Sequence, residues 1–212
     1  MPAGEKAWVA RTNLWSPPAG QALRAEFLCS AARVEEFPPE GLPEIAFLGR
    51  SNAGKSTLLN CLAGKNGLAF TSATPGRTRS INFYRVGKGF QFVDLPGYGF
   101  AAVSREAAAR WRGLIEAYLL DRRTLALCIL VLDARRGWTE KDLELRAWLE
   151  FHGKRYVVVA TKTDKLKSQK ERARGLAALQ NQSGPPLLLF SAVTGQGVKE
   201  IWQEIWKTPN RT

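Results

Sequence analysis

The feature that most constrains the fold is an unbroken apolar segment, Leu125 to Leu132, in the middle of the chain. A strand with one face in water alternates apolar and polar residues, whereas a strand covered on both faces can be apolar throughout. The segment is also far too short to cross a bilayer as a helix. It therefore predicts a central strand in a sheet that lies between two layers of helices.

Strand and helix patterns alternate along the chain from about residue 27 onward. The expected strands are Glu44 to Leu48, Ile81 to Val86, Phe90 to Asp94, Leu125 to Leu132, Arg155 to Ala160 and Pro186 to Phe190. The expected helices are Lys55 to Ala63, Glu106 to Leu120, Glu140 to Phe151, Lys165 to Gln180 and Gly197 to Lys207. This alternation predicts an α/β fold with a mostly parallel central sheet and helices on both faces. Such sheets bind ligands at the carboxyl ends of their strands.

The two ends of the chain depart from this pattern. Residues 1–26 contain a Pro-Pro-Ala-Gly segment and no sustained periodicity, which predicts a loosely ordered N-terminal extension. We expect one domain at residues 27–208 and a short C-terminal tail at 209–212. The first residues lack the apolar segment of a signal peptide, so a cytoplasmic location is expected. Three dispersed cysteines and a single histidine offer no zinc-binding pattern.

The chain is strongly basic, with 31 Lys and Arg against 19 Asp and Glu and a formal net charge of +12. An excess of this size favours a polyanionic partner, either nucleic acid or an anionic membrane surface. A basic surface without any such partner is the simpler alternative.

Residues 49–56 match the pattern G-x-x-x-x-G-K-[ST] between an expected strand and an expected helix, which is the context that a phosphate-binding loop requires. Its glycines let the backbone approach phosphate oxygens, and N–H groups at the helix start face the anion. Lys55 can reach the β- and γ-phosphates, and the Ser56 hydroxyl can bind Mg²⁺. The candidate residues are Gly49, Arg50, Ser51, Asn52, Ala53, Gly54, Lys55 and Ser56. The loop predicts a P-loop NTPase without identifying the base.

A second candidate element follows the expected strand Phe90 to Asp94. Its residues are Asp94, Leu95, Pro96 and Gly97. Asp94 can hold Mg²⁺ through water, and the Gly97 N–H can face a γ-phosphate. Pro96 and Gly97 are also common turn residues, so these four residues alone do not indicate a nucleotide site. Their position about 40 residues after the phosphate loop does.

A third candidate element follows the expected strand Arg155 to Ala160. Its residues are Thr161, Lys162, Thr163 and Asp164. The Asp164 carboxylate can accept hydrogen bonds from N1–H and N2–H₂ of guanine, and adenine offers no matching donor pair. The Lys162 stem can lie along the base. After the last strand, Ser191 and Ala192 can offer a backbone N–H to the guanine O6, so the set predicts a G domain.

Four segments in this order, G-R-S-N-A-G-K-S, T-P-G-R-T, D-L-P-G-Y-G-F-A and T-K-T-D, resemble the EngB family of bacterial ribosome-biogenesis GTPases, also called YihA or YsxC. The resemblance extends over roughly residues 25–207. It implies a first switch made of Gly76, Arg77, Thr78, Arg79 and Ser80, with Thr78 joining Ser56 as a second Mg²⁺ ligand. It also implies that Phe190, Ser191 and Ala192 close over the base.

The resemblance implies a cellular role and partners as well. The expected ligands are GTP and GDP with Mg²⁺ as cofactor, and the expected partner is the large ribosomal subunit with its rRNA. The family acts in assembly of that subunit and in normal cell division and septation. We expect a monomer that has no membrane partner. Binding to the subunit is expected to favour the GTP-loaded form and to weaken with added salt.

Two positions depart from the wider small-GTPase pattern. Thr161 stands where Asn is usual, which removes a bracing amide and predicts modest nucleotide affinity. Tyr98 follows Gly97 where a water-orienting Gln often stands. We therefore expect slow intrinsic hydrolysis and leave the catalytic residue unassigned. The missing group would come from a ribosomal partner, from the ion environment, or from Arg77, Arg79 or Arg105.

Two other functions are compatible with parts of this pattern. An RNA-binding assembly module could use the nucleotide mainly as a structural ligand, and Tyr98 in place of Gln gives this alternative some weight. A P-loop kinase or ATPase would share the phosphate loop, but Asp164 argues against it.

Overall fold

The computed structural model describes residues 24–69, 80–98, 105–166 and 169–208, without the side chains of 105–111, 169–174 and 183. Its centre is a seven-stranded sheet in the order β1-β3-β4-β2-β5-β6-β7. The strands are β1 (Ala25–Ala31), β2 (Glu44–Gly49), β3 (Ile81–Val86), β4 (Phe90–Asp94), β5 (Leu125–Asp133), β6 (Tyr156–Thr161) and β7 (Leu187–Leu189). The pairs from β4 through β7 are parallel, and β1 and β3 form an antiparallel edge. The predicted mostly parallel sheet is confirmed.

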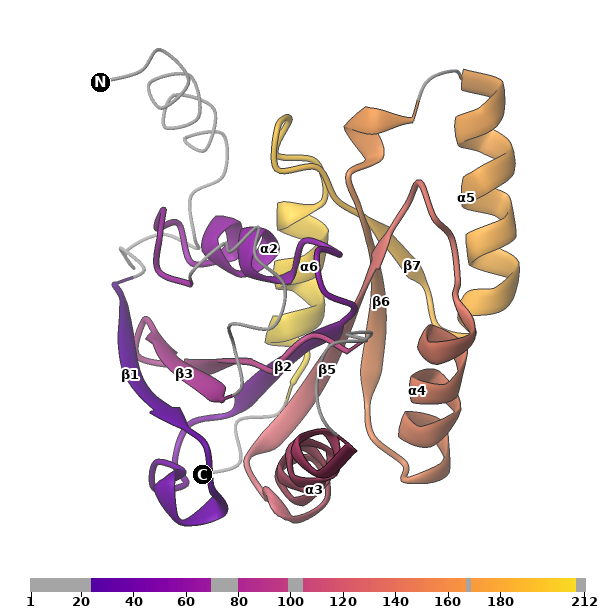
Figure 1. The fold of residues 1–212 in the computed structure, drawn as a ribbon. Coiled ribbons are helices and arrows are strands. Elements are labelled where there is room, and N and C mark those ends of the chain that lie inside the picture. Colours follow the sequence, from indigo (N-terminus) through magenta and orange to yellow (C-terminus); the bar gives the residue numbers. More distant parts are fainter. Residues whose placement is uncertain (1–23, 70–79, 99–104, 167–168, 209–212) are drawn as a thin grey trace.

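Helices cover both faces of this sheet, as the sequence predicts (Figure 1). One face carries α2 (Lys55–Leu62) and α6 (Val198–Trp206), whose apolar residues join one buried cluster. The other face carries α3 (Arg105–Asp121), α4 (Glu140–Phe151) and α5 (Gln169–Ser183), which contribute to a second cluster. The sheet thus separates two hydrophobic cores.

The apolar strand β5 shows why its sequence does not alternate. Leu127, Ile129 and Val131 belong to the α2 and α6 core. Cys128, Leu130 and Leu132 belong to the core beneath α3, α4 and α5. Because successive side chains point to opposite faces, both sets of positions must be apolar.

Strand β1 was not predicted, since residues 25–31 were assigned only to the region where the domain begins. It is an edge strand that pairs with β3 and contains an irregularity between Phe27 and Cys29. Its buried and exposed residues do not alternate, which removes the usual sequence signal. Helix α5 also begins later than the expected Lys165, because Thr163–Lys165 forms a short 3-10 helix.

A buried ion pair lies at the amino end of β2. The Arg122 guanidinium lies 2.6 Å from a Glu44 carboxylate oxygen, and Tyr118 donates a hydrogen bond of 2.9 Å to the other oxygen. Arg122 also donates to the Pro38 carbonyl oxygen. Glu44 is fully buried, and all of its carboxylate contacts come from residues more than seventy positions away. This network joins α3 to the sheet.

Candidate functional site

The phosphate-loop motif lies at the carboxyl end of β2 and runs directly into α2. Gly54, the residue before the helix, has a φ of 101°, and a Cβ there would lie 3.2 Å from the Thr161 hydroxyl oxygen. No side chain caps the start of α2. Its first backbone N–H groups can therefore bind an anion, as the sequence predicts.

The loop also holds a residue in a conformation that is uncommon outside glycine. Asn52 has a φ of 63°, in the left-handed region. The Ala53 N–H bonds back to the Arg50 carbonyl oxygen at 3.1 Å, which closes a tight turn between them. A strained residue held in place by surrounding bonds is common where a loop must present its backbone to a ligand.

The predicted metal-binding end of the site brings together Lys55, Ser56 and Asp94. The Ser56 hydroxyl lies 3.2 Å from one Asp94 carboxylate oxygen. The other oxygen, Oδ1, is buried without a hydrogen-bond partner. Burial raises the pKa of Asp94, and the nearby Lys55 ammonium and Ser56 hydroxyl only partly offset this effect. The site thus contains a buried carboxylate oxygen that lacks a hydrogen-bond partner among the described residues.

These groups fit a hard cation such as Mg²⁺. Mg²⁺ prefers oxygen ligands and keeps several waters, so it is commonly bound by one or two protein groups together with phosphates. Within the described residues no group of three or more His, Cys, Asp or Glu side chains could enclose a metal. A metal here would depend on the nucleotide for part of its coordination.

The second candidate element packs directly on the phosphate loop. The Ser51 N–H donates to the Tyr98 carbonyl oxygen at 3.1 Å. A Cβ on Gly97 would lie 2.7 Å from the Ser51 hydroxyl oxygen and 2.8 Å from its backbone nitrogen. Only glycine permits this approach, while Leu95 and Pro96 are buried behind it. Gly97 is therefore placed beside the predicted phosphate site.

The Tyr98 side chain is directed toward α4. Its hydroxyl donates a hydrogen bond of 2.5 Å to Asp142 Oδ1. The other Asp142 oxygen accepts bonds from the Thr139 N–H and hydroxyl, which completes a capping box at the start of α4. Burial, together with the Asp142 carboxylate, raises the pKa of Tyr98. Asp142 is not among the predicted site residues, although a Thr three residues before an Asp at a helix start is a recognisable cap.

The third candidate element, Thr161 to Asp164, is hydrogen-bonded to the phosphate loop. The Thr161 hydroxyl lies 2.5 Å from the Ala53 carbonyl oxygen and 3.0 Å from that of Leu132. Lys162, with a φ of 60°, donates to the Asn52 carbonyl oxygen at 2.5 Å. The sequence predicts that Thr161, in place of Asn, removes an amide that would brace this loop. In the structure the Thr161 hydroxyl braces the phosphate loop instead. Modest nucleotide affinity stays a prediction.

Asp133 at the end of β5 joins this element and was also missed. Lys162 Nζ lies 2.9 Å from Asp133 Oδ2, and the Arg135 guanidinium lies 2.6 Å from the same oxygen. Burial alone would raise the pKa of Asp133, but the hydrogen bonds from Arg135 and Lys162 outweigh it and hold the pKa well below its ordinary value. Asp133 thus stays charged and fixes the direction of the Lys162 stem.

The predicted guanine-recognition residues meet at the ends of β6 and β7. The Ser191 hydroxyl donates a bond of 2.7 Å to Asp164 Oδ1. Thr163 bonds through its hydroxyl to the Phe190 carbonyl oxygen at 3.2 Å. The Phe190 side chain itself is buried in the core, so its backbone rather than its ring faces the site. Ala192, two residues after Phe190, is partly exposed.

Several predicted residues of the first switch lie outside the described part of the chain. These are Gly76, Arg77, Thr78 and Arg79, and the side chain of Arg105 is likewise not described. Ser80 is described, and it accepts a bond of 2.6 Å from the Ser30 hydroxyl of β1. The second Mg²⁺ ligand expected at Thr78 is therefore not placed.

Comparisons with known proteins agree with this geometry. Residues 44–162 match a protein family described as "50S ribosome-binding GTPase". A probable GTP-binding protein EngB from Solibacter usitatus is 57% identical over 187 residues, covering 88% of this chain and 97% of that protein. A probable GTP-binding protein EngB from Geobacillus kaustophilus is 41% identical over 182 residues, covering 84% of this chain and 93% of that protein.

Solved structures show the same architecture. The crystal structure of a probable GTP-binding protein engB aligns with a TM-score of 0.63 at 26% identity, covering 77% of this chain and 97% of that chain. Aquifex aeolicus Era bound to GDP and aluminium fluoride aligns with a TM-score of 0.66 at 22% identity, covering 82% of this chain and 59% of that chain. At that identity, Era supports the fold alone.

Proposed function

Because this chain belongs to the EngB family of GTP-binding proteins, we propose that it is a Mg²⁺-dependent switch in assembly of the large ribosomal subunit. The chain is a GTPase, which converts GTP to GDP and phosphate. The observation that carries the proposal is the arrangement of Lys55, Asp94 and Asp164. They lie at or just after the carboxyl ends of β2, β4 and β6 in the parallel part of the sheet, and the segment after β6 is hydrogen-bonded to the phosphate loop that follows β2.

We assign the nucleotide contacts by the chemistry of these loops. The backbone of residues 49–56 would surround the phosphates, with Lys55 on the β- and γ-phosphates. Asp164 would accept from N1–H and N2–H₂ of guanine, oriented by the Ser191 hydroxyl. The Ser191 N–H donates to the Gln196 carbonyl oxygen, which leaves the neighbouring Ala192 N–H for the guanine O6. Thr161 and Lys162 would keep the base-binding loop at a fixed position relative to the phosphate loop.

The metal would be held by Ser56 and Thr78, with Asp94 acting through water. When bound, Mg²⁺ offsets the charge that develops on the phosphate oxygens. The buried, unpartnered Asp94 Oδ1 supports this assignment. Gly97 would place its N–H at the γ-phosphate, so that the element Asp94 to Gly97, which would begin a second switch, responds to the presence of that group.

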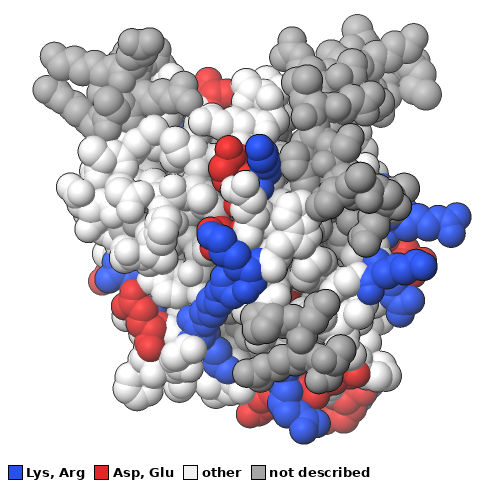
Figure 2. Space-filling model, turned by 180° about the vertical axis from the view of Figure 1, so that it is seen from behind, with Lys and Arg blue, Asp and Glu red and all other residues white. Residues whose placement is uncertain are grey.

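The ribosomal role rests on the family and on charge. The matching family is described as binding the 50S subunit, and the net charge of +12 suits a polyanionic partner. Figure 2 shows a run of Lys and Arg side chains across the middle of one face. Among the described residues, no helix has the length and apolar character needed to cross a membrane. We extend the proposal to a monomer in the cytoplasm that supports cell division and septation, as the family resemblance implies.

Slow intrinsic hydrolysis is part of the proposal. Tyr98, which follows Gly97 where a Gln often orients water, is bonded to Asp142 and directed toward α4. A catalytic group supplied by the ribosomal partner, or one of Arg77, Arg79 and Arg105, would then raise the rate. The same observation favours the alternative of an RNA-binding module that uses nucleotide mainly as a structural ligand. Multiple-turnover phosphate release that rises with added large subunits would support the switch over the module.

The guanine assignment has a direct test in Asp164→Asn. An Asn amide donates where the carboxylate accepts, so the variant should lose affinity for GTP and gain affinity for XTP, whose C2 carries an oxygen. Titration with fluorescent GTP and XTP analogues measures both affinities. Unchanged preference for GTP would remove Asp164 from the base-binding site.

A further inference from the structure

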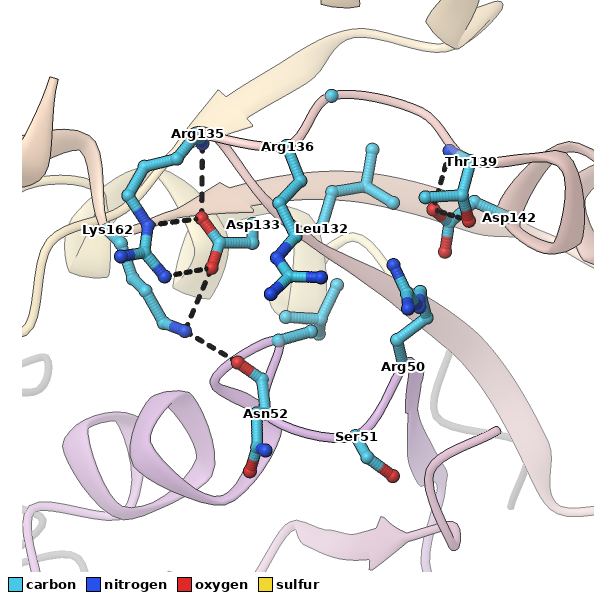
Figure 3. A pocket seen from close by; sticks show the side chains of 13 residues that line it. Arg50, Ser51, Asn52, Leu132, Asp133, Arg135, Arg136, Thr139, Asp142 and Lys162 are labelled. Carbon is cyan, nitrogen blue, oxygen red and sulfur yellow. Dashed lines mark hydrogen bonds and ion pairs between the residues drawn. The ribbon is translucent and has the colours of Figure 1, made fainter. Parts of the chain in front are cut away.

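A pocket of about 230 Å³ lies on the outer side of the phosphate loop (Figure 3). One wall is Arg50, Ser51, Asn52 and Ala53 of that loop. The opposite wall is the end of β5 and the connection to α4, from Val131 to Asp142. Lys162 closes one side.

This pocket adjoins the predicted nucleotide site and shares residues 50–53 and Lys162 with it. Lys55, Ser56, Asp94 and Asp164 do not line it, although all four are described. A phosphate loop presents its backbone N–H groups to the nucleotide, so its side chains project elsewhere. The side chains at positions 50 to 53 contribute to this second pocket, and the phosphate loop is a wall shared between two sites.

The charges that line the pocket are unbalanced. Four cationic side chains, those of Arg50, Arg135, Arg136 and Lys162, face two carboxylates, Asp133 and Asp142. Asp133 is already bonded to Arg135 and Lys162. Asp142 accepts from Tyr98 and Thr139. The lining therefore carries two positive charges in excess.

The excess resides on Arg50 and Arg136. Neither guanidinium forms a hydrogen bond or an ion pair with another described residue. In Figure 3 both reach into the pocket, one from each wall. Arg50 is half-buried beside Tyr98, whose phenol it influences electrostatically, whereas Arg136 is exposed. Two guanidinium groups converging on one space without an acidic partner call for an anion between them.

We propose that this pocket binds a phosphate group of the RNA backbone, held between the Arg50 and Arg136 guanidiniums. Planar guanidinium groups bind phosphate oxygens in pairs, and each phosphodiester carries one negative charge. The inference rests on the proposed ribosomal function for the source of the RNA. It also gives that function a structural link, because an RNA phosphate on Arg50 would contact the same loop that holds the nucleotide.

The test measures binding of a short fluorescent oligouridine to GDP-saturated protein over a series of salt concentrations. Arg136→Gln should weaken binding about tenfold and lower the slope of log affinity against log salt by about one, because one phosphate contact is lost. Arg50→Gln should act in the same direction. Because Arg50 belongs to the phosphate loop, its loss can also change nucleotide binding, so GDP affinity is measured for each variant. The Arg136→Gln result therefore decides whether the proposal holds.

Arg24→Gln is the matched control. Arg24 is exposed next to edge strand β1, several strands away from the pocket, so its loss removes the same charge at a distant place. It should change oligouridine affinity less than twofold and leave the salt slope unchanged, as expected for one distant surface charge. Equal effects of Arg136→Gln and Arg24→Gln, or an unchanged slope in Arg136→Gln, would overturn the inference.

The outcome separates this inference from the proposed function. If Arg136→Gln binds oligouridine like the wild type while large subunits still stimulate phosphate release, the pocket proposal fails and the function stands. If Arg136→Gln shows the expected loss but subunits stimulate nothing, the pocket stands and the ribosomal switch fails.

Discussion

Two buried carboxylates, Glu44 and Asp94, lie on the neighbouring parallel strands β2 and β4. Glu44 is at the amino end of its strand and Asp94 is at the carboxyl end of its strand. Glu44 is 0% exposed at the start of β2, and Asp94 is 6% exposed at the end of β4. Both oxygens of Glu44 are bonded by Arg122 and Tyr118. Asp94 has one bond, from Ser56, and one oxygen without a partner. The Glu44 carboxylate thus has a hydrogen-bond partner at each oxygen, whereas the Asp94 carboxylate has a partner at only one.

The difference shows how to distinguish a structural carboxylate from a functional one. A buried charge is costly unless it is paired and hydrogen-bonded. Glu44 finds its partners in the folded chain, so removing either partner would leave a buried charge uncompensated. Asp94 lacks them, and its raised pKa records that burial is incompletely offset. A metal-bound water at this oxygen would supply the missing partner, which is the role proposed for Asp94.

The largest effect should follow from breaking the complete pair. Glu44→Gln would leave the Arg122 charge buried beside a neutral amide, and the free energy of unfolding should fall by about 3–5 kcal/mol. Urea denaturation measures the loss. Glu40→Gln is the control, because its partner Arg123 is 88% exposed, and it should cost less than about 1 kcal/mol. Equal losses in the two variants would show that burial of Glu44 carries no special weight.

Asp94→Asn should behave in the opposite way. Affinity for GTP in the presence of Mg²⁺ should fall about 10–100-fold, because the carboxylate that orients the metal's water is lost. The stability of the nucleotide-free protein should not fall, since the variant removes a buried charge that lacks a partner. A large loss of stability without any loss of Mg²⁺-dependent affinity would make Asp94 a second structural carboxylate.

The pH dependence of this variant sharpens the comparison. A raised pKa means that the folded state binds the Asp94 proton more tightly than the unfolded state, so stability is lost as pH rises from the unfolded pKa through the folded one. Without metal and nucleotide, Asp94→Asn should match the wild type in acid and become relatively more stable as the pH rises through that window. Mg²⁺ with GTP should reverse the difference.

The smallest effect should come from Tyr98→Phe. Asp142 is buried like Asp94 but is fully bonded within the protein, so losing the Tyr98 hydroxyl should cost about 1 kcal/mol of unfolding free energy. Tyr156→Phe removes a similar bond to the exposed Glu150 and serves as the control, with a smaller expected loss. A larger cost in Tyr156→Phe would mean that burial of Asp142 gives the Tyr98 hydrogen bond no added weight in stability.

The sequence predicts the positions of the candidate site residues in the fold well where chemistry and spacing coincide. The glycines and Lys55 of the phosphate loop, Asp94 and the Thr161 to Asp164 element all lie at strand ends where the alternating pattern puts them. Strands β3 and β4 and helix α4 have the expected boundaries. These features are local, because each depends on a short segment and on its neighbours along the chain.

The features that escaped prediction depend on distant contacts. Glu44 and Arg122 are 78 positions apart, and Tyr98 and Asp142 are 44 apart. Neither pair leaves a periodic trace in the sequence. Strand β1 is defined by its pairing with β3 rather than by its own pattern. Such features become visible only when the fold brings the partners together.

The bonds from Thr161 and Lys162 to the phosphate loop bear on how a bound nucleotide escapes. Thr161 bonds to the Ala53 carbonyl oxygen and Lys162 to that of Asn52, so the loop proposed to bind the purine cannot move away without displacing the loop proposed to bind the phosphates. GDP would then lose its base contacts and its phosphate contacts together rather than one after the other. A partner protein that displaced either loop would therefore weaken the contacts to the base and to the phosphates together.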